Sequence, residues 1–433
     1  MAGERIRSTR SVCPVCLRNL PAALYRQEDG AVTLEKSCPI HGDFSVPVWQ
    51  GLLDFDAWIA GAEPLGEGGA LRCPGSCGLC SEHETDSCCV LLEVTKRCNL
   101  RCRFCFADGG SGEADPPTEE LKAAIRDIAE RCGKPLIQFS GGEPTLRDDL
   151  PELVKYAKEV GCAYTQVNTN GLRLARDPAF VKALAEAGLD IVFLQFDGTR
   201  EEIYEKLRGA PLLQAKLEAI RLCGENRIGV TLVPTVVKGV NDGDLGALVA
   251  LAASLAPAVR AIHFQPVSYF GRCPGKPAAE DRYTLDRLMA DIAAQAGIPP
   301  ESFLPSRCDH PLCGFHSSFL IEPGSGLRPL GSITRAPGGR GSARVNREYV
   351  ARRWQRAPEP EKPGDGSMSC ALSGEMDFDT FLYRVRNESL TLSAMAFQDA
   401  GNLNLERLRR CSLHVYDGGR IKPFCAKYLT AMA

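Results

Sequence analysis

The chain has 433 residues, of which 44% are hydrophobic and 24% are charged, and its formal charge is −3. At about 150 residues per domain, this length predicts two or three domains, and the hydrophobic share excludes a largely disordered chain. The near-neutral charge argues against a protein that binds nucleic acid mainly through charge.

No segment is long enough to be expected to cross a membrane. The longest apolar candidate, residues 245–259, is shorter than the ~18 residues that a span needs. Residues 1–14 lack the apolar core of a secretory signal. We therefore expect a cytoplasmic protein, for which a peripheral membrane contact stays open.

Cysteine is the unusual component, with 20 residues, eleven of them before residue 106. A secreted disulfide framework usually occupies a short chain, whereas this chain is long and shows no signal peptide. Closely spaced cysteines in such a chain are better interpreted as metal thiolates.

Residues 1–70 form the first expected domain, a small metal-binding ribbon of the rubredoxin or zinc-ribbon kind. Two short strands flank an Asp-Gly turn at residues 29–30, between a CPVC segment and a CPIH segment. Three cysteines and one histidine suit zinc, with a rubredoxin-like iron as the alternative. The imidazole could instead cap a turn while another cysteine fills the fourth position. The candidate ligands are Cys13, Cys16, Cys38 and His41.

Residues 71–89 follow a Gly-rich link at 66–69 and carry a C-x3-C-x2-C motif ahead of the next expected strand. A motif in that position is a poor candidate for the main cofactor but a good one for an auxiliary iron–sulfur cluster. Its cysteines are Cys73, Cys77 and Cys80. The fourth ligand is either Cys88 or a residue from the C-terminal region.

Residues 90–297 alternate between apolar, β-branched runs and amphipathic helical patterns. This alternation predicts an α/β fold in which right-handed crossovers curl a parallel sheet into a partial (β/α)6 TIM-like barrel. A full barrel of eight units is not expected, because the pattern stops near residue 297. The expected strands are 90–95, 135–141, 163–170, 190–198, 227–237 and 261–269, and the expected helices are 118–131, 148–160, 177–187, 201–223, 243–255 and 284–297.

The first of these strands leads into the segment Cys98-Asn-Leu-Arg-Cys102-Arg-Phe-Cys105. Three thiolates can hold a [4Fe–4S] cluster and leave one iron open to an outside ligand, whereas four would close it. A zinc knuckle is the alternative. The motif, placed directly after a strand of a β/α alternation, resembles the radical S-adenosylmethionine (SAM) superfamily, in which SAM binds the open iron. Phe104 matches the aromatic residue that the superfamily usually has there.

Residues at the ends of the next three strands support that resemblance. Gly141-Gly142-Glu143-Pro144 ends the second strand, where glycines allow a close backbone approach and a carboxylate can accept from an ammonium group. In the superfamily the corresponding GGE segment holds the methionine amino group. Capping of the following helices is the competing explanation for the other polar residues. These candidate SAM ligands are Asn168, Asn170, Gln195 and Asp197.

Residues 298–433 form the last expected domain, an irregular iron–sulfur and substrate region. Pro, Gly and Arg dominate residues 323–366, which we interpret as a loop that is flexible or ordered by a partner. The basic run around 335–355 is either a solvated surface or a contact for an anionic group. The cysteines here could hold a further cluster or be isolated buried residues. They are Cys308, Cys313, Cys411 and Cys425.

Motifs over about residues 11–428 resemble the archaeal tetraether lipid synthase family and its bacterial relatives, formerly labelled pterin-linked radical methylases. The resemblance implies a SAM-binding [4Fe–4S] cluster at Cys98, Cys102 and Cys105, and a rubredoxin-like metal at the N-terminus. It also implies one or two auxiliary [4Fe–4S] clusters. Their ligands would come from Cys73, Cys77, Cys80, Cys88, Cys308, Cys313, Cys411 and Cys425.

The expected function is that of an oxygen-sensitive radical SAM enzyme that abstracts hydrogen from an unactivated carbon and forms a carbon–carbon bond on a lipid chain. The alternatives are a methyl or one-carbon transferase acting on a non-lipid substrate, and a non-catalytic iron–sulfur carrier or scaffold. The GGEP segment and the β/α alternation argue against the last, since a carrier needs neither. No side chain is singled out as catalytic.

The expected partners are an electron donor such as ferredoxin or flavodoxin and a substrate that is a small molecule or a lipid, but not nucleic acid. A lipid chain requires a long apolar tunnel. We expect such a tunnel between the barrel mouth and residues 300–320 and 393–415.

Overall fold

The computed structural model describes residues 3–60, 62, 72–75, 77–110, 112–306, 308–322, 324, 326–330, 342–356 and 378–432. The predicted Gly-rich link at 66–69 and most of the predicted loop at 323–366 lie outside these ranges. Within them, no helix is both long and apolar enough to span a membrane.

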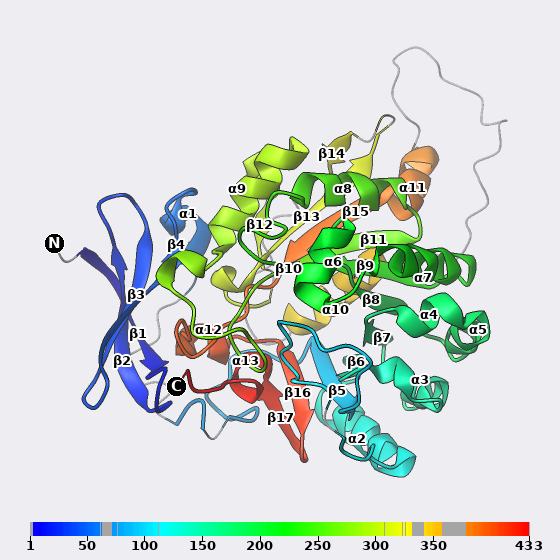
Figure 1. Ribbon diagram of the computed structural model, residues 1–433, viewed down its shortest axis with the longest axis horizontal. Helices are drawn as coiled ribbons and strands as arrows, with labels where there is room; N and C mark the ends of the chain where they lie inside the picture. The colour runs from blue at the N-terminus through cyan, green and yellow to red at the C-terminus, as the bar shows by residue number, and fades with distance from the viewer. Residues whose placement is uncertain are drawn as a thin grey trace.

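The N-terminal part is an antiparallel sheet of four strands in the order β1-β2-β3-β4, at the blue end of Figure 1. The predicted Asp-Gly turn joins its two middle strands, and Gly30 has a φ of +82°, a value that favours glycine. Only the two strands beside this turn were predicted from the sequence. The elements are β1 (Glu4–Val12), β2 (Asn19–Arg26), β3 (Val32–Cys38), β4 (Gly42–Trp49) and the following helix α1 (Phe55–Ile59).

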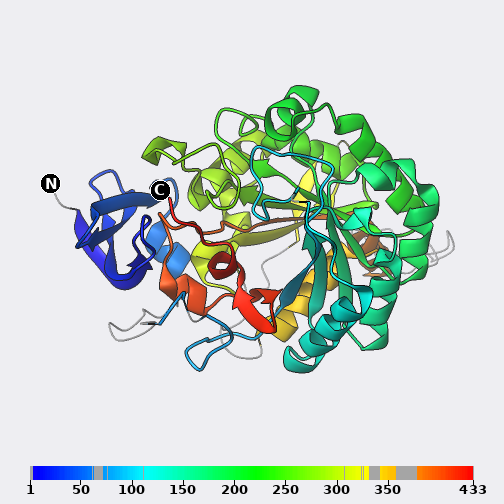
Figure 2. The ribbon, with the colours of Figure 1, turned by 60° about the horizontal axis from the view of Figure 1, so that its bottom comes forward.

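All six predicted strands of the barrel are present, and they pair in parallel in the chain order β5-β6-β7-β8-β9-β11. Their residues are almost all buried, as expected for a sheet that is covered by helices on one face and closes around a core on the other. Figure 2 shows the strands curling inside an outer ring of helices. The strands are β5 (Cys89–Thr95), β6 (Leu136–Gly141), β7 (Tyr164–Thr169), β8 (Ile191–Gln195), β9 (Gly229–Val233), the short β10 (Thr235–Val236) and β11 (Val259–Pro266).

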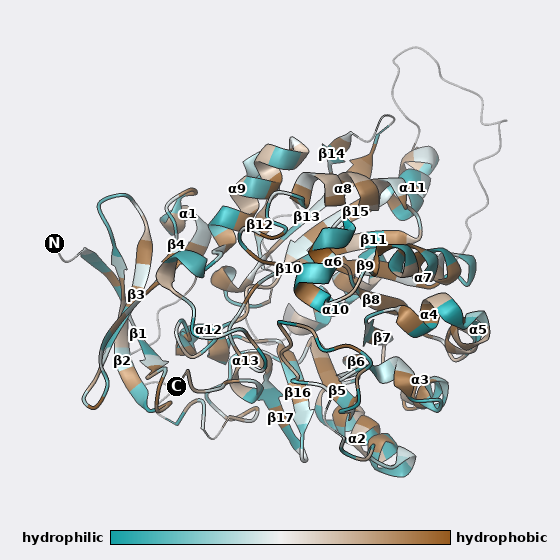
Figure 3. Cartoon of the chain, viewed as in Figure 1, coloured by the Kyte–Doolittle hydropathy of each residue, from teal (hydrophilic) through white to brown (hydrophobic). Residues whose placement is uncertain are grey.

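The helices between these strands follow the predicted positions with two exceptions, the unpredicted short helix α4 and the division of one predicted helix into two. The predicted single helix at 201–223 is wrong, because Gly209 ends α6 in the left-handed conformation at φ +82° and Pro211 comes two residues later. Brown stripes on the helices in Figure 3 mark the apolar residues that pack on the sheet. The helices are α2 (Thr118–Arg131), α3 (Leu150–Glu159), α4 (Leu172–Arg176), α5 (Pro178–Glu186), α6 (Glu201–Arg208), α7 (Leu213–Glu225), α8 (Leu245–Ser254) and α9 (Leu285–Ala296).

The C-terminal region is more regular than anticipated, because it adds strands to both edges of the partial barrel. β15 pairs in parallel with β11, and β16 pairs in parallel with β5, so that the continuous sheet runs from β12 to β17. The orange and red strands therefore lie on either side of the barrel in Figure 1. The elements are β12 (Leu304–Pro305), β13 (Phe315–Ile321), β14 (Leu327–Pro329), α10 (Ser342–Trp354), α11 (Phe378–Asn387), β15 (Ser389–Ala394), α12 (Leu405–Arg409), β16 (Leu413–Asp417), β17 (Arg420–Pro423) and α13 (Phe424–Lys427).

Helix α10 packs where β9 begins, at the amino-terminal end of the barrel strands. A Cβ on Gly229, the first residue of β9, would lie 2.2 Å from the carbonyl oxygen of Trp354, so only glycine permits this approach. The Trp354 indole stacks on Phe193 of β8 at a ring separation of 5.7 Å. The end of α10 therefore forms the inner floor of the barrel, and part of the predicted basic run belongs to this helix.

Candidate active site and metal centres

The three cysteines of the second C-x3-C-x2-C motif line one cavity of about 160 Å³ at the carboxyl ends of the barrel strands. Burial, together with the smaller effects of Glu143 and the thiols of Cys102 and Cys105, raises the pKa of the Cys98 thiol to about 11, although the amide of Leu100 lowers it. We call this space the motif cavity. The other predicted residues in its wall are Phe104, Gly141, Gly142, Glu143, Asn168, Asn170 and Gln195.

The cysteine loop is fixed on one side by the glycines that end β6. The amide of Gly142 donates to the carbonyl oxygen of Thr95 at 2.8 Å, and that of Glu143 donates to the oxygen of Arg97 at 2.7 Å. A Cβ on Gly141 or Gly142 would lie 2.1 Å from those same oxygens, so neither position accepts a larger residue without movement of the loop. Gly141 and Gly142 therefore allow the end of β6 to pack closely against the backbone that leads into the cysteine loop.

Two arginines hold the same loop from the other side. Backbone hydrogen bonds of 2.9 Å run in both directions between Cys105 and Arg272, and the Arg272 side chain donates to the carbonyl oxygen of Cys102 at 2.9 Å. The Arg208 guanidinium donates to the carbonyl oxygen of Phe104 at 3.3 Å. With these contacts the thiol-bearing segment is positioned by strands and helices on both flanks.

Glu143 is buried at the bottom of the motif cavity and joins the ends of β6 and β7. Its Oε1 accepts from the hydroxyls of Thr145 and Thr169, each at 2.6 Å, and from the Thr145 amide at 3.1 Å. Its Oε2 accepts only from the amide of Asn170, at 2.7 Å, among the described residues. A carboxylate oxygen has two acceptor positions, so Oε2 keeps one that a ligand's ammonium group could use.

Of the remaining polar residues predicted to bind SAM, some line the motif cavity and one lies behind its wall. The amide oxygen of Asn170 accepts from the amide of Leu172, the first residue of α4, at 3.0 Å, and its Nδ2 donates to Asn99 of the cysteine loop at 2.7 Å. Asn168 and Gln195 line the cavity. Asp197 does not, because its carboxylate lies behind the wall in an ion pair of 2.6 Å with Arg208.

Sequence reasoning assigned no role to two buried cations beside the cavity, Arg208 and Lys216. Lys216 donates to the carbonyl oxygens of Asn170 and Gln195 at 2.9 and 2.7 Å, and to the Gln195 side chain at 2.9 Å. Burial lowers the pKa of this ammonium to about 7, although Asp197 opposes the shift. A lysine and an arginine at otherwise buried positions of α6 and α7 were the signal that could have revealed them.

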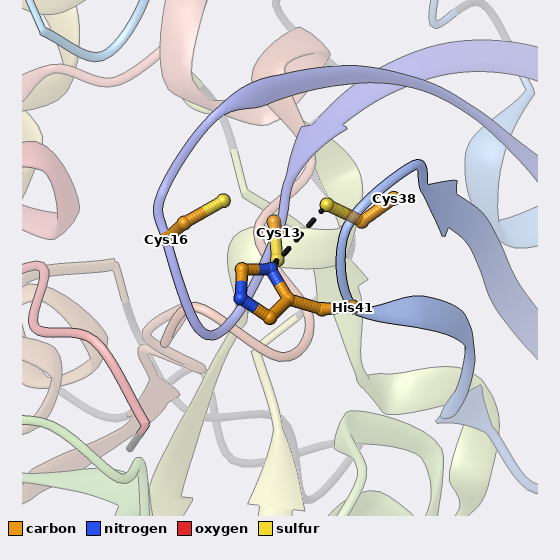
Figure 4. A group of neighbouring side chains, drawn as sticks. All are labelled: Cys13, Cys16, Cys38 and His41. Carbon is orange, nitrogen blue, oxygen red and sulfur yellow. Dashed lines mark hydrogen bonds between the residues drawn. The ribbon is translucent and has the colours of Figure 1, made fainter.

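The N-terminal ligand set also comes together as predicted. One side-chain atom from each of Cys13, Cys16, Cys38 and His41 lies within 4.8 Å of all the others (Figure 4). The Nδ1 of His41 faces the sulfurs of Cys13 and Cys38 at 3.4 and 3.5 Å. Backbone amides, that of Ile40 first, lower the pKa of Cys38 to about 6 and so favour the thiolate. Three sulfurs and one imidazole converging on one point fit a tetrahedral metal ion.

Comparisons with known proteins agree with both sites. The family model described as "Radical SAM superfamily" matches residues 92–252, and the one described as "HMPTM N-terminal zinc ribbon domain" matches residues 5–50. The chain is 32% identical over 476 residues to a 7,8-dihydro-6-hydroxymethylpterin dimethyltransferase of Methanocaldococcus jannaschii, and the alignment covers 97% of the chain and 92% of the relative. The chain belongs to the radical SAM superfamily. Within it, the chain belongs to the family of this dimethyltransferase.

This radical SAM enzyme has further, partial relatives. It is 39% identical over 235 residues to an Fe-coproporphyrin III synthase of Methanosarcina barkeri, over 51% of its own length and 56% of that of the relative. Among solved structures it is similar to Streptococcus suis SuiB bound to the precursor peptide SuiA, with 17% identity and a TM-score of 0.41 over 49% and 47% of the two chains. The family assignment rests on the full-length relative.

The donor set of the motif cavity fits the cofactors that the superfamily implies. Three cysteines line one wall, which matches a [4Fe–4S] cluster that needs three thiolates and keeps one iron open. The glycines and the free acceptor position of Glu143 border the same space. A cluster and SAM therefore have candidate ligands here.

The first C-x3-C-x2-C motif of this radical SAM enzyme lies apart from the motif cavity. Cys73, Cys77 and Cys80 line a separate small cavity together with His83. Cys88, the expected fourth ligand, is not in that cavity and instead packs in a buried cluster with Cys308 and Ala343. The structure thus brings His83, rather than Cys88, to these three cysteines.

The other C-terminal cysteines form a third neighbourhood. Burial raises the pKa of Cys411 well above its ordinary value, and Asp309 and the thiols of Cys425 and Cys313 raise it further. The Cys425 sulfur also accepts a hydrogen bond from the amide of Gln398 at 3.3 Å. Cys313, Cys411 and Cys425 therefore influence one another electrostatically, although they are far apart in the sequence.

A second cavity of about 160 Å³, which we call the lumen cavity, occupies the barrel interior. Most of its wall is apolar, and it reaches residues 306–316 and 391–413, the region in which the sequence predicted a tunnel. The two cavities share wall residues, so they lie next to each other. The shared residues are Phe106, Asn168, Gln265 and Phe397.

Proposed function

We propose that this radical SAM enzyme forms a carbon–carbon bond at an unactivated carbon of a substrate that lies in the lumen cavity. The observation that carries the proposal is the shared wall of the two cavities, which puts a lumen ligand beside the space bordered by Cys98, Cys102 and Cys105. When bound there, a [4Fe–4S] cluster and SAM supply a carbon radical that can take a hydrogen atom from substrate.

The chain's own residues bind and orient these groups. Cys98, Cys102 and Cys105 would hold the cluster, and Oε2 of Glu143 would accept from the methionine ammonium group of SAM. Asn168 and Gln195 supply further hydrogen-bonding groups in the same wall. The apolar lumen excludes water from a reactive radical, which protects it from side reactions.

The mostly apolar lumen wall supports a hydrocarbon chain as the substrate, since such a chain gains free energy by leaving water. A second candidate is methyl or one-carbon transfer to a carbon of a smaller, non-lipid molecule. It is supported by the relative over 97% of the chain, which is a 7,8-dihydro-6-hydroxymethylpterin dimethyltransferase. A methyl group joined to carbon is also a new carbon–carbon bond, so the two candidates share the radical step.

The remaining cysteines support auxiliary metal sites. Cys73, Cys77 and Cys80 with His83 form one candidate cluster site, and Cys313, Cys411 and Cys425 supply ligands for another. Zinc or iron would bind at the N-terminal ribbon. The enzyme would receive electrons from a low-potential donor such as ferredoxin or flavodoxin.

The test is anaerobic reconstitution with iron and sulfide, followed by addition of dithionite and SAM. Formation of 5′-deoxyadenosine and methionine is the expected result. Deuterium-labelled candidate substrates, one a lipid and one a pterin, would then show which one transfers its label to 5′-deoxyadenosine. Absence of 5′-deoxyadenosine from the reconstituted protein, with either substrate present, would contradict the proposal.

A further inference from the structure

Three polar side chains of the ribbon strand β1 face the C-terminal region where it forms helix α12 (Figure 1). Arg7, Thr9 and Ser11 stand at alternate positions and therefore point to the same side of the strand. The Thr9 hydroxyl donates to Oδ1 of Asn404 at 2.7 Å, and the Ser11 hydroxyl donates to the carbonyl oxygen of Leu403 at 2.5 Å. Thr9, Ser11 and Asn404 are all buried. We call this interface the ribbon seam.

An ion pair extends the ribbon seam to a cysteine. The Arg7 guanidinium donates to both carboxylate oxygens of Glu406, from Nε to Oε2 at 3.0 Å, and the two side chains are 11% and 3% exposed. The carboxylate also lies 3.1 Å from Nε2 of His310. The next residue of α12, Arg407, donates to the sulfur of Cys313 at 3.4 Å. Helix α12 therefore joins the ribbon to residues 308–316, which we call the Cys313 segment.

Both ribbon strands that contribute to the seam end at ligands of the ribbon metal site (Figure 4). Cys13 comes directly after β1, and Cys38 is the last residue of β3. Lys36 of β3 donates from Nζ to the carbonyl oxygens of Ala400 and Gly401 at 3.0 and 2.6 Å. A metal ion held by the ribbon ligands would therefore fix the ends of both strands that touch the C-terminal region.

The contacts of the ribbon seam stabilise α12 only while both sides are in place. A buried polar group that loses its partner is destabilised by its desolvation, and the effect is largest for a charge. Without Arg7, the Glu406 carboxylate would keep only His310 as a side-chain partner among the described residues. The position of α12 should therefore depend on whether the ribbon is folded.

We infer that the metal-loaded ribbon positions the Cys313 segment through α12, and that Arg7 and Glu406 are the positioning residues. Metal binding at one end of the seam and order at the Cys313 segment are thus coupled. The inference rests on the proposed function only in taking Cys313 as a ligand of an auxiliary cluster. It gives the ribbon a role in holding that ligand in place.

The test is amide hydrogen exchange, measured by mass spectrometry on the reconstituted full-length protein under anaerobic conditions. Arg7→Met breaks the seam, and the double variant Cys16→Ala/His41→Ala removes two metal ligands that lie outside the strands. Both should exchange faster than the wild type in residues 308–316 and 403–412, whereas residues 150–159 of α3 should not change. For Arg7→Met we expect about 10- to 100-fold, the equivalent of one hydrogen bond to a charged group.

The matched control is Arg5→Met, an exposed position of the same strand, which should leave exchange unchanged throughout. Arg7→Lys keeps the charge and should recover part of the protection. Thr9→Val removes a single hydrogen bond, and it should act on the same segments if Arg7→Met lowers the yield of folded protein.

Unchanged exchange of residues 308–316 in the metal-site double variant would overturn the inference. An equal increase in α3 would overturn it as well, since it would show general destabilisation rather than positioning. The proposed function fails on a different result, the absence of 5′-deoxyadenosine, which the exchange measurement does not use.

Discussion

The ion pair behind the motif cavity offers the sharpest test of how the site is built. Asp197 accepts two hydrogen bonds from Arg208, at 2.6 and 2.7 Å, and a third from the amide of Thr235 at 3.1 Å. The side chains of Asp197 and Arg208 are 0% and 5% exposed. Burial alone would lower the pKa of Arg208, but Asp197 more than offsets this effect, and the pKa is raised.

Asp197→Asn removes the charge and keeps the shape, so Arg208 remains buried without a counter-ion. Removing one partner of a buried pair costs about 3–5 kcal/mol of unfolding free energy. Arg208→Met alone should be similarly destabilising, since it leaves the Asp197 carboxylate unpaired. The double variant should be less destabilised than the two single variants combined, by about 1–3 kcal/mol.

The assay is urea unfolding of the four proteins, with bound iron per chain measured in parallel. Because Arg208 also donates to the cysteine loop, the single variants should retain less iron than the wild type. Glu218→Gln, which breaks an exposed ion pair with Arg221, is the control and should not change either quantity. Strictly additive effects of the two substitutions would refute the reasoning.

Three further predictions concern the cofactors and pH. Cys102→Ala should abolish SAM cleavage and lower the iron content by about one cluster. Cys273→Ala, which removes a half-buried thiol that donates to the oxygen of Gly275, should change neither quantity. Unchanged cleavage in Cys102→Ala would mean that the cysteine set is wrong. His41→Ala should release the ribbon metal to a chelator at least tenfold faster than the wild type, as followed with a colorimetric metal indicator, and equal release would exclude His41 as a ligand. Lys216 should destabilise the fold less as the pH rises from about 7 to 10.5, so the unfolding free energy of the wild type minus that of Lys216→Met should increase over this range.

The sign of the last effect follows from proton binding. The folded-state pKa of Lys216 is lowered to about 7 from 10.5, so between these values the unfolded chain binds more protons than the folded one. The contribution of Lys216 to stability therefore increases with pH across this window, and the destabilising effect of its buried charge is fully present below it. An identical pH dependence of urea midpoints in wild type and Lys216→Met would contradict the assignment.

The barrel could be predicted from sequence because its strands and helices follow regular apolar patterns. The cysteine motif could be recognised because its spacing is specific to the binding of a [4Fe–4S] cluster. Such patterns do not indicate whether a polar side chain at the end of a strand points into a cavity or away from it. Asn170 and Asp197 follow successive strands in similar ways, yet Asn170 lines the motif cavity and Asp197 lies behind it. The role of Lys216 was not predicted for a different reason, because a lysine in a helix is normally exposed to solvent.

The auxiliary cysteines illustrate a further limit, because their grouping depends on a strand pairing that joins distant segments. β16 pairs in parallel with β5, with Leu413 opposite Cys89, and so residues 411–414 lie beside residues 83–89. Across this junction the amide of Cys88 donates to Ser412 at 2.9 Å, and the rings of His83 and His414 approach to 3.1 Å between their Nε2 atoms. The first cysteine motif and Cys411 therefore meet through a strand of only five residues, and its sequence does not indicate which barrel strand it pairs with. A cluster held by Cys73, Cys77, Cys80 and His83 would in turn hold β16 on the barrel, because His83 contacts both Cys411 and His414. Cluster binding and closure of this sheet edge should therefore be thermodynamically coupled.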